Sequence, residues 1–351
     1  MESIKWRYEK YVKPHMLMSD GVFNGLYRKV GNFFKLNSPD VICYVSADPT
    51  NIGDRVSALG VQHMFGVAGI ETFASRAGLS ATKKLFKRLV LSRKNVLIVV
   101  GGGGLLQKCF EPFWEILLET GLDFVLFGVG ANELLPERTL PSEDVIDALG
   151  VNALGLHVRD AWTAELFTSS SNLRIGVCPS VNYLYRKYGW FGCSVPKDLL
   201  LHVCHPTDIR MAGGNLNDIR SKVKKIAEAR NLIYGEVNHI DEKLSTLISQ
   251  YKKSKLIVSS RLHGCIFSYA LGLPFIPIST DRKTEAFIAT HMPKKRYFNC
   301  DFDSQDLHNE VEKLLLENKS YFNCDFINKL NFNYLYINEL LSVLSNRNYF
   351  Y

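Results

Sequence analysis

Short apolar runs alternate with amphipathic segments along most of the chain. Runs of about four to eight apolar and β-branched residues, bounded by glycine or polar residues, predict buried strands, because a strand inside a parallel sheet has no exposed face. Segments with apolar residues at helical spacing lie between these runs and predict helices. In the first half of the chain, the predicted strands are residues 41–47, 95–100, 124–130, 154–158 and 174–178.

The alternation restarts in the second half, after a passage rich in aromatic residues and glycine that we interpret as the connection between two domains, residues 181–196. The elements predicted beyond it are strands at 199–203, 232–236, 256–260 and 275–279, and helices at 215–230, 241–252 and 265–271. This alternation predicts an α/β fold of two doubly wound, Rossmann-like domains that face each other across a cleft, a GT-B-like layout.

The length of the chain, 351 residues, exceeds the size at which one hydrophobic core is comfortable. We expect an N-terminal arm, two Rossmann-like domains and a C-terminal helix that packs back on the body, at residues 1–38, 39–190, 191–330 and 331–351. Ligands of such sheets bind outside the carboxyl ends of the strands. The functional site is therefore expected where the strand ends of the two domains face each other.

Composition narrows the class of protein. Hydrophobic residues make up 46% of the chain and charged residues 22%, which is typical of a globular protein. No apolar run is long enough to cross a bilayer, and residues 1–30 interleave charges with aromatic side chains, unlike a signal peptide. The eight cysteines show no CxxC spacing, which favours reduced core thiols. We therefore expect a cytoplasmic protein.

Positive charge is concentrated between Glu71 and Glu111, an interval that contains no acidic residue. The basic residues inside it are Arg76, Lys83, Lys84, Lys87, Arg88, Arg93, Lys94 and Lys108. Such a segment can contact anionic lipid headgroups or a phosphorylated substrate, or can simply be a solvated helix face. No nucleic-acid-binding motif accompanies it, so we expect no nucleic-acid partner and keep open a peripheral contact of residues 76–108 with an anionic membrane surface.

The stretch 255–283 combines a predicted buried strand with polar residues at its end. Arg261 and His263 follow the strand, and in an extended segment residues two apart point the same way. Gly264 is expected to open a short apolar helix whose free N–H groups face the same place. A guanidinium, an imidazole and a helix amino terminus together predict an anion site with an acid/base group. The alternative is that both residues are surface or capping residues.

Two further elements lie at predicted strand ends in the first half. Asn51, Gly53 and Asp54 follow the first strand, and Asp54 is either a helix cap or a site residue. Residues 101–104 are four glycines, which predict a turn where a ligand lies directly against the backbone, or else tight packing of helix on sheet. The spacing is not GxGxxG, and a following acidic residue in the right context is missing, so a nicotinamide cofactor is disfavoured.

A cluster of potential metal ligands occurs at His202, Cys204 and His205. Alternation along the predicted strand puts His202 and Cys204 on one face and His205 on the other, so the three do not converge. We therefore expect no metal site.

The motif S-R-L-H-G, followed by an apolar helix, G-L-P, an apolar strand and Asp281 with Lys283, resembles the C-terminal signature of the polysaccharide pyruvyl transferase family. The N-x-G-D element at 51–54, the glycine segment, the R-D pair at 159–160 and the C-P-S sequence at 178–180 are also similar to the family. The chain departs from the family at A-N-E-L-L-P-E, where a Gly-Pro-containing segment is usual, so no role is assigned to Asn132 or Glu133.

The resemblance implies transfer of a pyruvyl group from phosphoenolpyruvate to a sugar as a ketal, without a further cofactor. It implies that Arg159 and Arg261 clamp the donor, that the backbone at Leu262 and Gly264 adds N–H donors, and that His263 transfers a proton. Lys283 is a further donor-site candidate. The cleft or acceptor-side candidates are Asn51, Gly53, Asp54, Gly102, Gly103, Gly104, Ser180 and Asp281. The implied acceptor is a sugar, an oligosaccharide or a lipid-linked glycan.

Two other functions stay open. A glycosyltransferase of the same layout would bind a nucleotide-sugar, and Glu236, at the end of a predicted strand, could hold the ribose. A non-catalytic sugar-phosphate-binding protein would use His263 only as a helix cap.

Overall fold

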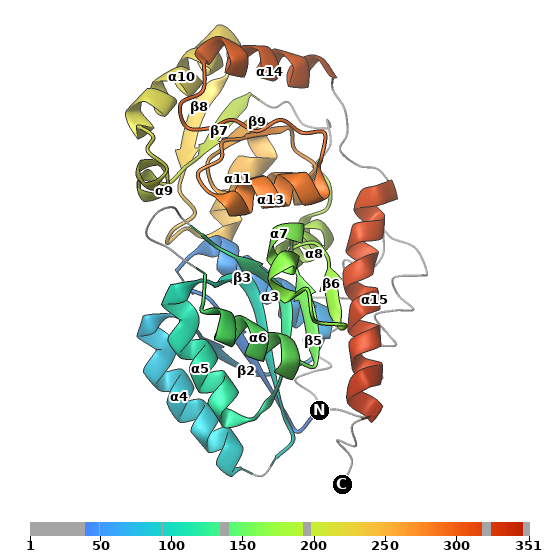
Figure 1. The fold of residues 1–351 in the computed structure, drawn as a ribbon. Coiled ribbons are helices and arrows are strands. Elements are labelled where there is room, and N and C mark those ends of the chain that lie inside the picture. The colour runs from blue at the N-terminus through green and yellow to red at the C-terminus, as the bar shows by residue number, and fades with distance from the viewer. Residues whose placement is uncertain are drawn as a thin grey trace.

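The computed structural model describes residues 39–317 and 324–346, except 49, 93, 134–139 and 192–197. The expected arm at 1–38 and the last five residues lie outside this part of the chain. The described residues form two parallel sheets, one above the other in Figure 1, each between layers of helices. The α/β class is therefore confirmed, whereas the exact domain boundaries stay a prediction.

The first sheet has six parallel strands in the order β2-β1-β3-β4-β5-β6. Their bounds are Val41–Ser46 (β1), Ile70–Phe73 (β2), Val96–Leu106 (β3), Asp123–Ala131 (β4), Gly155–Val158 (β5) and Leu173–Ile175 (β6). Alternate residues face opposite layers, since Cys43 and Val45 belong to one buried cluster and Ile42 and Tyr44 to another. The edge strand β2 was not expected, because only one of its four residues is buried and it lacks an apolar run.

Helices cover both faces of this sheet. Their bounds are Ile52–Phe65 (α3), Arg76–Leu91 (α4), Glu111–Thr120 (α5), Glu143–Asn152 (α6) and Ala161–Ala164 (α7), with 3-10 turns at Lys108–Phe110 (η3) and Glu165–Phe167 (η4). One buried cluster contains side chains of α4, α5, α6 and α7, and the cluster on the other face contains side chains of α3. The site-forming edge is the one where α3 begins.

The glycine run does not form the expected turn. Residues 101–104 continue β3, which pairs with β4 as far as Leu106 and Ala131, and α5 starts only at Glu111, with Pro112 in its first turn. Gly102 and Gly103 have φ angles of 86° and 95°, which L side chains rarely adopt. The glycines therefore bend a long strand rather than connect a strand to a helix.

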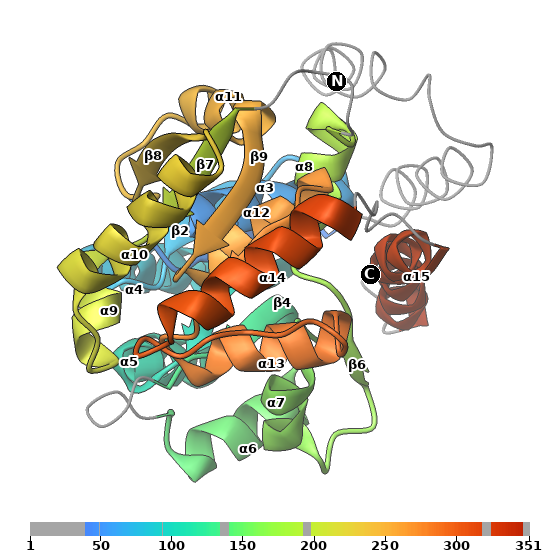
Figure 2. The same cartoon turned by 90° about the horizontal axis from the view of Figure 1, so that it is seen from above.

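The second sheet has four parallel strands in the order β10-β9-β7-β8. The strands are Leu199–Val203 (β7), Ile233–Val237 (β8), Ser254–Ser259 (β9) and Phe275–Pro277 (β10). The helices are Pro206–Met211 (α9), Leu216–Ala229 (α10), Leu244–Lys253 (α11), Leu262–Leu271 (α12), Arg282–His291 (α13) and Ser304–Glu317 (α14). Side chains of α10 and α14 belong to one buried cluster and those of α11 and α12 to another. Helices therefore cover both faces of this sheet (Figure 2).

Two helices join the halves. Residues 181–188, the first part of the passage that we interpreted as the connection between domains, belong to α8 (Pro179–Tyr188), and this helix packs on both α3 and α12. Val181 and Leu184, three residues apart, are its buried contacts. Helix α15 (Cys324–Asn346) runs along the side of the molecule in Figure 1 and contacts α3 and α8. None of the helices in the described ranges is long and apolar enough to cross a membrane.

A buried asparagine fastens α15 to the first sheet. Asn333 is fully buried, and its amide group donates to the carbonyl oxygen of Val177 and to Asn182 Oδ1, at 2.9 and 2.8 Å. Its Oδ1 accepts from the N–H of Val177 at 3.2 Å and lies 2.9 Å from His157 Nε2. The side chain therefore makes four hydrogen bonds in the core, where each is costly to lose.

Candidate active site between the two sheets

The halves meet where α3 begins. The N–H of Ile52 donates to the carbonyl oxygen of His239 at 3.0 Å, and the N–H of Asp241 donates to that of Thr50 at 3.2 Å. These bonds hold the start of α3 against the loop after β8. The carboxyl ends of both sheets therefore face each other at this point, as expected for a ligand site in paired doubly wound domains.

The S-R-L-H-G segment lies at this junction, with a different local structure from the one expected. Arg261 is extended, but α12 already begins at Leu262, so His263 belongs to the first helical turn and the argument from an extended segment is wrong. The N–H of Gly264 donates to the carbonyl oxygen of Arg261 at 3.0 Å and is not a free donor, contrary to expectation. Within the described ranges, the N–H groups of Leu262 and His263 have no acceptor.

His263 reaches across to the first half of the chain. Its side chain is 8% exposed, and its ring packs directly on Gly53, where a Cβ atom would overlap the imidazole. Nε2 is buried and has no hydrogen-bond partner among the described residues. Burial, followed by the nearby charges of Arg159, His239, Arg261 and Lys283, lowers the pKa of His263 well below its usual value. The ring is therefore neutral at pH 7 and presents an unsatisfied nitrogen.

Arg159 is a buried guanidinium with few partners. It follows β5, is 1% exposed and packs over Gly130, where any side chain would overlap it. Its Nε lies 3.3 Å from Asp160 Oδ2 and its Nη2 lies 3.4 Å from the carbonyl oxygen of Ala131, both long distances for hydrogen bonds. Since a guanidinium has five donors, most of its capacity is unused. His291 of α13 approaches the carbonyl oxygen of Arg159 at 2.7 Å and links this residue to the second half.

The neighbouring Asp160 caps α7. Its Oδ1 accepts from the N–H and the hydroxyl of Thr163 at 2.8 and 2.7 Å. The side chain of Arg159 is enclosed against Gly130 of β4 and does not reach solvent.

Arg261 is held from the second half. Its Nη1 donates to the carbonyl oxygen of Asn238, and its Nε lies 3.6 Å from Asp208 Oδ2 of α9. The side chain is 11% exposed. These contacts fix one side of the guanidinium, while its charge acts on both His263 and Asp54.

Asp54 is a buried carboxylate that does not cap α3. The cap is Asn51, whose Oδ1 accepts from the N–H of Gly53 at 3.0 Å. Asp54 lies against Gly103, where a Cβ atom would collide with its Oδ1, and it makes no hydrogen bond with any described residue. Burial raises the pKa of Asp54 to about 6, although the charges of Arg159, Arg261 and Lys283 oppose the shift. Asp54 therefore does not cap the helix, and its carboxyl group titrates near neutrality.

Lys283 connects the two halves at the edge of the site. Its Nζ lies 2.7 Å from Asp281 Oδ2 and donates to Asn132 Oδ1 at 3.1 Å. Asn132 in turn donates to Gln107 Oε1 at 2.9 Å. Asp281 also caps α13 by accepting from Thr284, so its position is explained by structure alone. Gly104 packs against the side chain of Asn132.

Gly102 and Ser180 lie apart from this cluster. Gly102 packs against Ser57 in α3, and Ser180 hydrogen-bonds Cys178, whose sulfur lies 3.0 Å from Ser57 Oγ. Both residues therefore belong to the packing of α3 on β3 and α8. His239, which the sequence analysis did not single out, is fully buried behind Arg261 and packs on Phe267.

The structure thus brings together Arg159, Arg261, Lys283, Asp54 and His263. Arg159, Arg261 and Lys283 are the leading charges that act on the pKa of Asp54, and all three also act, together with His239, on the pKa of His263. Each of the three cations has a carboxylate beside it. Those carboxylates are not among the leading causes of the pKa shift of His263. Two guanidinium groups, an ammonium group and an unpaired imidazole nitrogen that lie close to one another are the groups needed to bind a small anion and move a proton.

In a second polar cluster the carboxylate is already engaged by the protein itself. His202, Cys204 and Glu236 place ligand atoms within 4.8 Å of one another, and in the described chain no other such group occurs. However, Glu236 accepts from Arg220 with both oxygens, at 2.6 and 2.7 Å, and from the hydroxyl of Tyr234 at 2.6 Å. A metal ion would have to share this carboxylate with a guanidinium, and a ribose would have to displace it.

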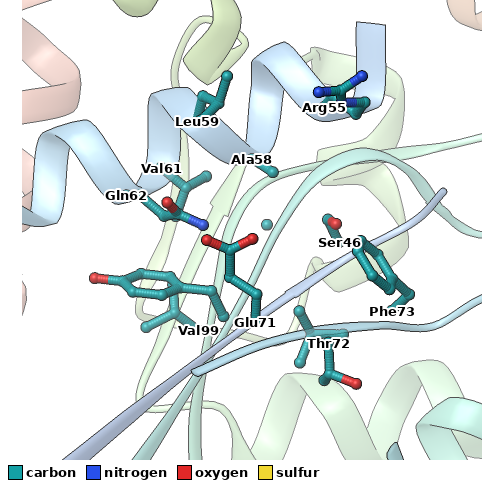
Figure 3. A pocket seen from close by; sticks show the side chains of 13 residues that line it. Ser46, Arg55, Ala58, Leu59, Val61, Gln62, Glu71, Thr72, Phe73 and Val99 are labelled. Atoms are coloured by element: carbon teal, nitrogen blue, oxygen red, sulfur yellow. The ribbon is translucent and has the colours of Figure 1, made fainter. Parts of the chain in front are cut away.

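A cavity of about 140 Å³ lies on the other side of α3 (Figure 3). Glu71 of β2 and Gln62 of α3 point into it, and Arg55 is the basic residue in its lining. None of the five clustered residues lines this cavity. One guanidinium balanced by one carboxylate does not provide the positive charge that a doubly anionic ligand requires.

The fold and this junction define a GT-B-like α/β protein with a cluster of cationic side chains between its halves. Solved structures agree on the fold. UDP-GlcNAc 2-epimerase from Neisseria meningitidis bound to UDP-GlcNAc is 11% identical with a TM-score of 0.53, over 86% of this chain and 99% of that chain. The enzyme from Methanocaldococcus jannaschii in complex with UDP-GlcNAc and UDP is 9% identical with a TM-score of 0.52, over 83% and 99%. At these identities the likeness concerns the fold alone.

The family is established by a comparison of sequence. The description of the polysaccharide pyruvyl transferase family matches residues 51–282, and the chain belongs to this family. The matched region begins at the N-x-G-D element and ends beside Lys283, so it contains Asp54, Arg159, Arg261 and His263. A comparison with curated proteins found no match.

Proposed function

We propose that the protein transfers the pyruvyl group of phosphoenolpyruvate to two hydroxyl groups of one sugar and forms a cyclic ketal. The observation that carries this proposal is the convergence of Arg159, Arg261 and Lys283 on one buried imidazole whose Nε2 has no partner. Phosphoenolpyruvate carries a carboxylate and a phosphate that are both attached to its central carbon. Guanidinium groups match both anions, because each can donate two parallel hydrogen bonds to an oxyanion.

In this proposal the two arginines hold the donor from opposite halves. Arg159 supplies unused donors from the first half, and Arg261 supplies its free side from the second. The unpaired N–H groups of Leu262 and His263, at the positive end of α12, add donors for the phosphate. Binding therefore requires both halves in the arrangement that the structure shows.

The chemistry follows from the enol phosphate. A proton added to the methylene carbon makes the central carbon cationic, and the oxygen of a sugar hydroxyl bonds to it. A second hydroxyl oxygen then bonds to the same carbon, and the bond to the phosphate breaks. Of the two hydroxyl protons, one balances the proton in the new methyl group and the other leaves with inorganic phosphate. No cofactor is needed beyond phosphoenolpyruvate as co-substrate.

Two groups divide the proton transfers. His263 is neutral in the free protein, and the anionic donor screens the cations that lower its pKa. His263 then binds a proton, donates it to the methylene carbon and regains one from the first hydroxyl. Asp54, whose pKa in the free protein is about 6, accepts the proton of the second hydroxyl. Its position in the first half, beside Gly103, agrees with an acceptor on that side.

A glycosyltransferase-like use of a nucleotide-sugar is the second candidate, because the neighbouring folds include epimerases bound to UDP-GlcNAc. Glu236, the residue considered for the ribose, is engaged by Arg220 and Tyr234, which disfavours this alternative. Thermal unfolding separates the two. Phosphoenolpyruvate should raise the unfolding temperature and UDP-GlcNAc should not, because a ligand stabilises only the state that binds it.

The direct test is incubation with phosphoenolpyruvate and a panel of sugar and lipid-linked glycan acceptors. We expect phosphate release that depends on an acceptor, together with the mass gain of a pyruvyl ketal. His263→Gln should retain donor binding and lose transfer. If His263→Gln transfers pyruvate as fast as the unaltered protein, the imidazole is only structural. If phosphate release is absent with every acceptor while a UDP-sugar is consumed, the proposed function is wrong.

A further inference from the structure

The outer face of α4 carries cations without partners. Arg76, Lys83, Lys84, Lys87 and Arg88 are all exposed, and α4 contains no acidic residue. In the part of the chain that the structure describes, none of these five side chains forms an ion pair or a hydrogen bond. The inner face of α4 is anchored in the core of the first half through other residues, so its basic face is free to bind a partner.

Apolar side chains adjoin these cations at the end of the helix. Leu91 is 71% exposed and Val90 is 45% exposed. A groove of about 360 Å³ runs between α4 and α5, which lie next to each other on the outside of the first sheet (Figure 1). The groove is lined by Lys83, Lys87, Val90, Leu91, Ile116, Glu119 and Thr120. Two ammonium groups therefore border an open apolar channel, and Glu119 is the acidic residue in its lining.

We propose that this α4–α5 surface, formed by the α4 cations and the groove residues, docks onto an anionic lipid bilayer. Lysines next to the bilayer gain from phosphate headgroups, and exposed Val90 and Leu91 gain from the boundary between headgroups and acyl chains. Nucleic acid would use the cations but leave these apolar side chains in water. The aromatic residue of α4, Phe86, is fully buried and cannot stack on bases.

The proposal stands on the α4–α5 surface alone and not on the proposed reaction. None of its residues belongs to the cluster around His263. Variants of this surface should therefore change membrane binding and leave transfer to a water-soluble acceptor unchanged.

The test is flotation of the full chain with two kinds of vesicle at low and high salt. One contains phosphatidylcholine alone, and the other contains phosphatidylcholine with phosphatidylglycerol. We expect binding to the anionic vesicles, reduced by salt. Lys83→Gln/Lys87→Gln should lower the partition coefficient about 30-fold, since each lysine near an anionic surface contributes about fivefold. Leu91→Ser should lower it about tenfold through loss of apolar contact.

The matched control is Lys252→Gln/Lys253→Gln, which makes the same change of charge at two exposed lysines at the end of α11. It should alter binding by less than about twofold. Glu119→Gln should strengthen binding, because it removes the carboxylate that lines the groove. All the substituted side chains are exposed. Unchanged unfolding temperatures would show that the variants fold.

Several results would overturn the proposal. Equal binding to neutral and anionic vesicles would do so, as would equal losses in the α4 pair and the α11 pair. Binding that is indifferent to Leu91→Ser would show that the apolar side chains do not enter the bilayer. Retention of short duplex DNA or inorganic polyphosphate without binding to vesicles would assign the surface to a different partner.

Discussion

Asp54→Asn removes the carboxylate that lies among Arg159, Arg261 and Lys283, and the variant should be more stable than the unaltered protein at neutral pH. Burial raises the pKa of Asp54 from 3.8 to about 6. A shift of about two units, at about 1.4 kcal/mol each, corresponds to about 3 kcal/mol. The folded state binds the proton more tightly, so this cost is absent below about pH 4, grows between about pH 4 and 6, and is complete above about pH 6.

The assay is chemical unfolding of both proteins at several values between pH 4 and 8. The difference in the free energy of unfolding should be near zero at pH 4 and should favour Asp54→Asn by about 1–3 kcal/mol at pH 7, because an asparagine replaces the protonated acid imperfectly. Transfer should fall by about 100-fold or more through loss of the proton acceptor. Asp281→Asn is the control, since it removes the carboxylate beside Lys283 but leaves a side chain that can cap α13, and it should not stabilise the protein at pH 7. A loss of stability in Asp54→Asn at pH 7 would refute the reasoning.

Three more outcomes are expected. Gly53→Ala should force the His263 ring away and lower the transfer rate more than it lowers stability. Activity assays and thermal unfolding of the same sample measure the two effects, and an unchanged transfer rate would contradict the observed packing. Phosphoenolpyruvate binding at pH 7 should be coupled to the uptake of a proton, which makes the binding enthalpy depend on the buffer, and His263→Gln should abolish this uptake. An equal uptake in the variant would show that another group binds the proton. Asn333→Ala should destabilise by about 3 kcal/mol or more in chemical unfolding, whereas a loss under about 1 kcal/mol would mean that its four bonds are replaced.

Buried strands were the most predictable feature of the sequence. The central strands β1, β3, β4, β7 and β9 are continuous apolar runs, because both of their faces are covered. The edge strand β2 is mostly exposed and has no such run, so pattern alone could not find it. Helix α8 was missed because several of its buried residues are polar or proline, and its aromatic residues resemble those of a linker.

Local geometry at the site was less predictable than its location. The sequence indicated that Arg159, Arg261 and His263 follow parallel strands, and parallel topology alone brings such residues to one edge. It did not indicate that α12 starts at Leu262, because a helix start shifts by one or two residues without a change of pattern. Whether Asp54 caps α3 depended on the side chain of Asn51, three residues earlier.

Other features of the site depend on contacts between segments that are far apart in the sequence. His263 packs on Gly53, and Asp54 packs on Gly103. No pattern in the sequence indicates either contact. Of the two interpretations of the glycine run, the structure shows tight packing of helix on sheet, since Gly102 lies against Ser57 and Gly103 against Asp54, both in α3. Lys283 and Asn132 meet only because the two halves are docked.

Calorimetric titration of phosphoenolpyruvate into the protein tests the central claim most directly, with UDP-GlcNAc and inorganic phosphate as comparison ligands and Arg159→Lys as the comparison variant. We expect one phosphoenolpyruvate per chain, weaker binding of phosphate and about tenfold or greater loss of affinity in Arg159→Lys, because an ammonium group cannot form the paired hydrogen bonds of a guanidinium. Tight binding of UDP-GlcNAc, with phosphoenolpyruvate bound no better than phosphate or equally well by Arg159→Lys, would contradict the account.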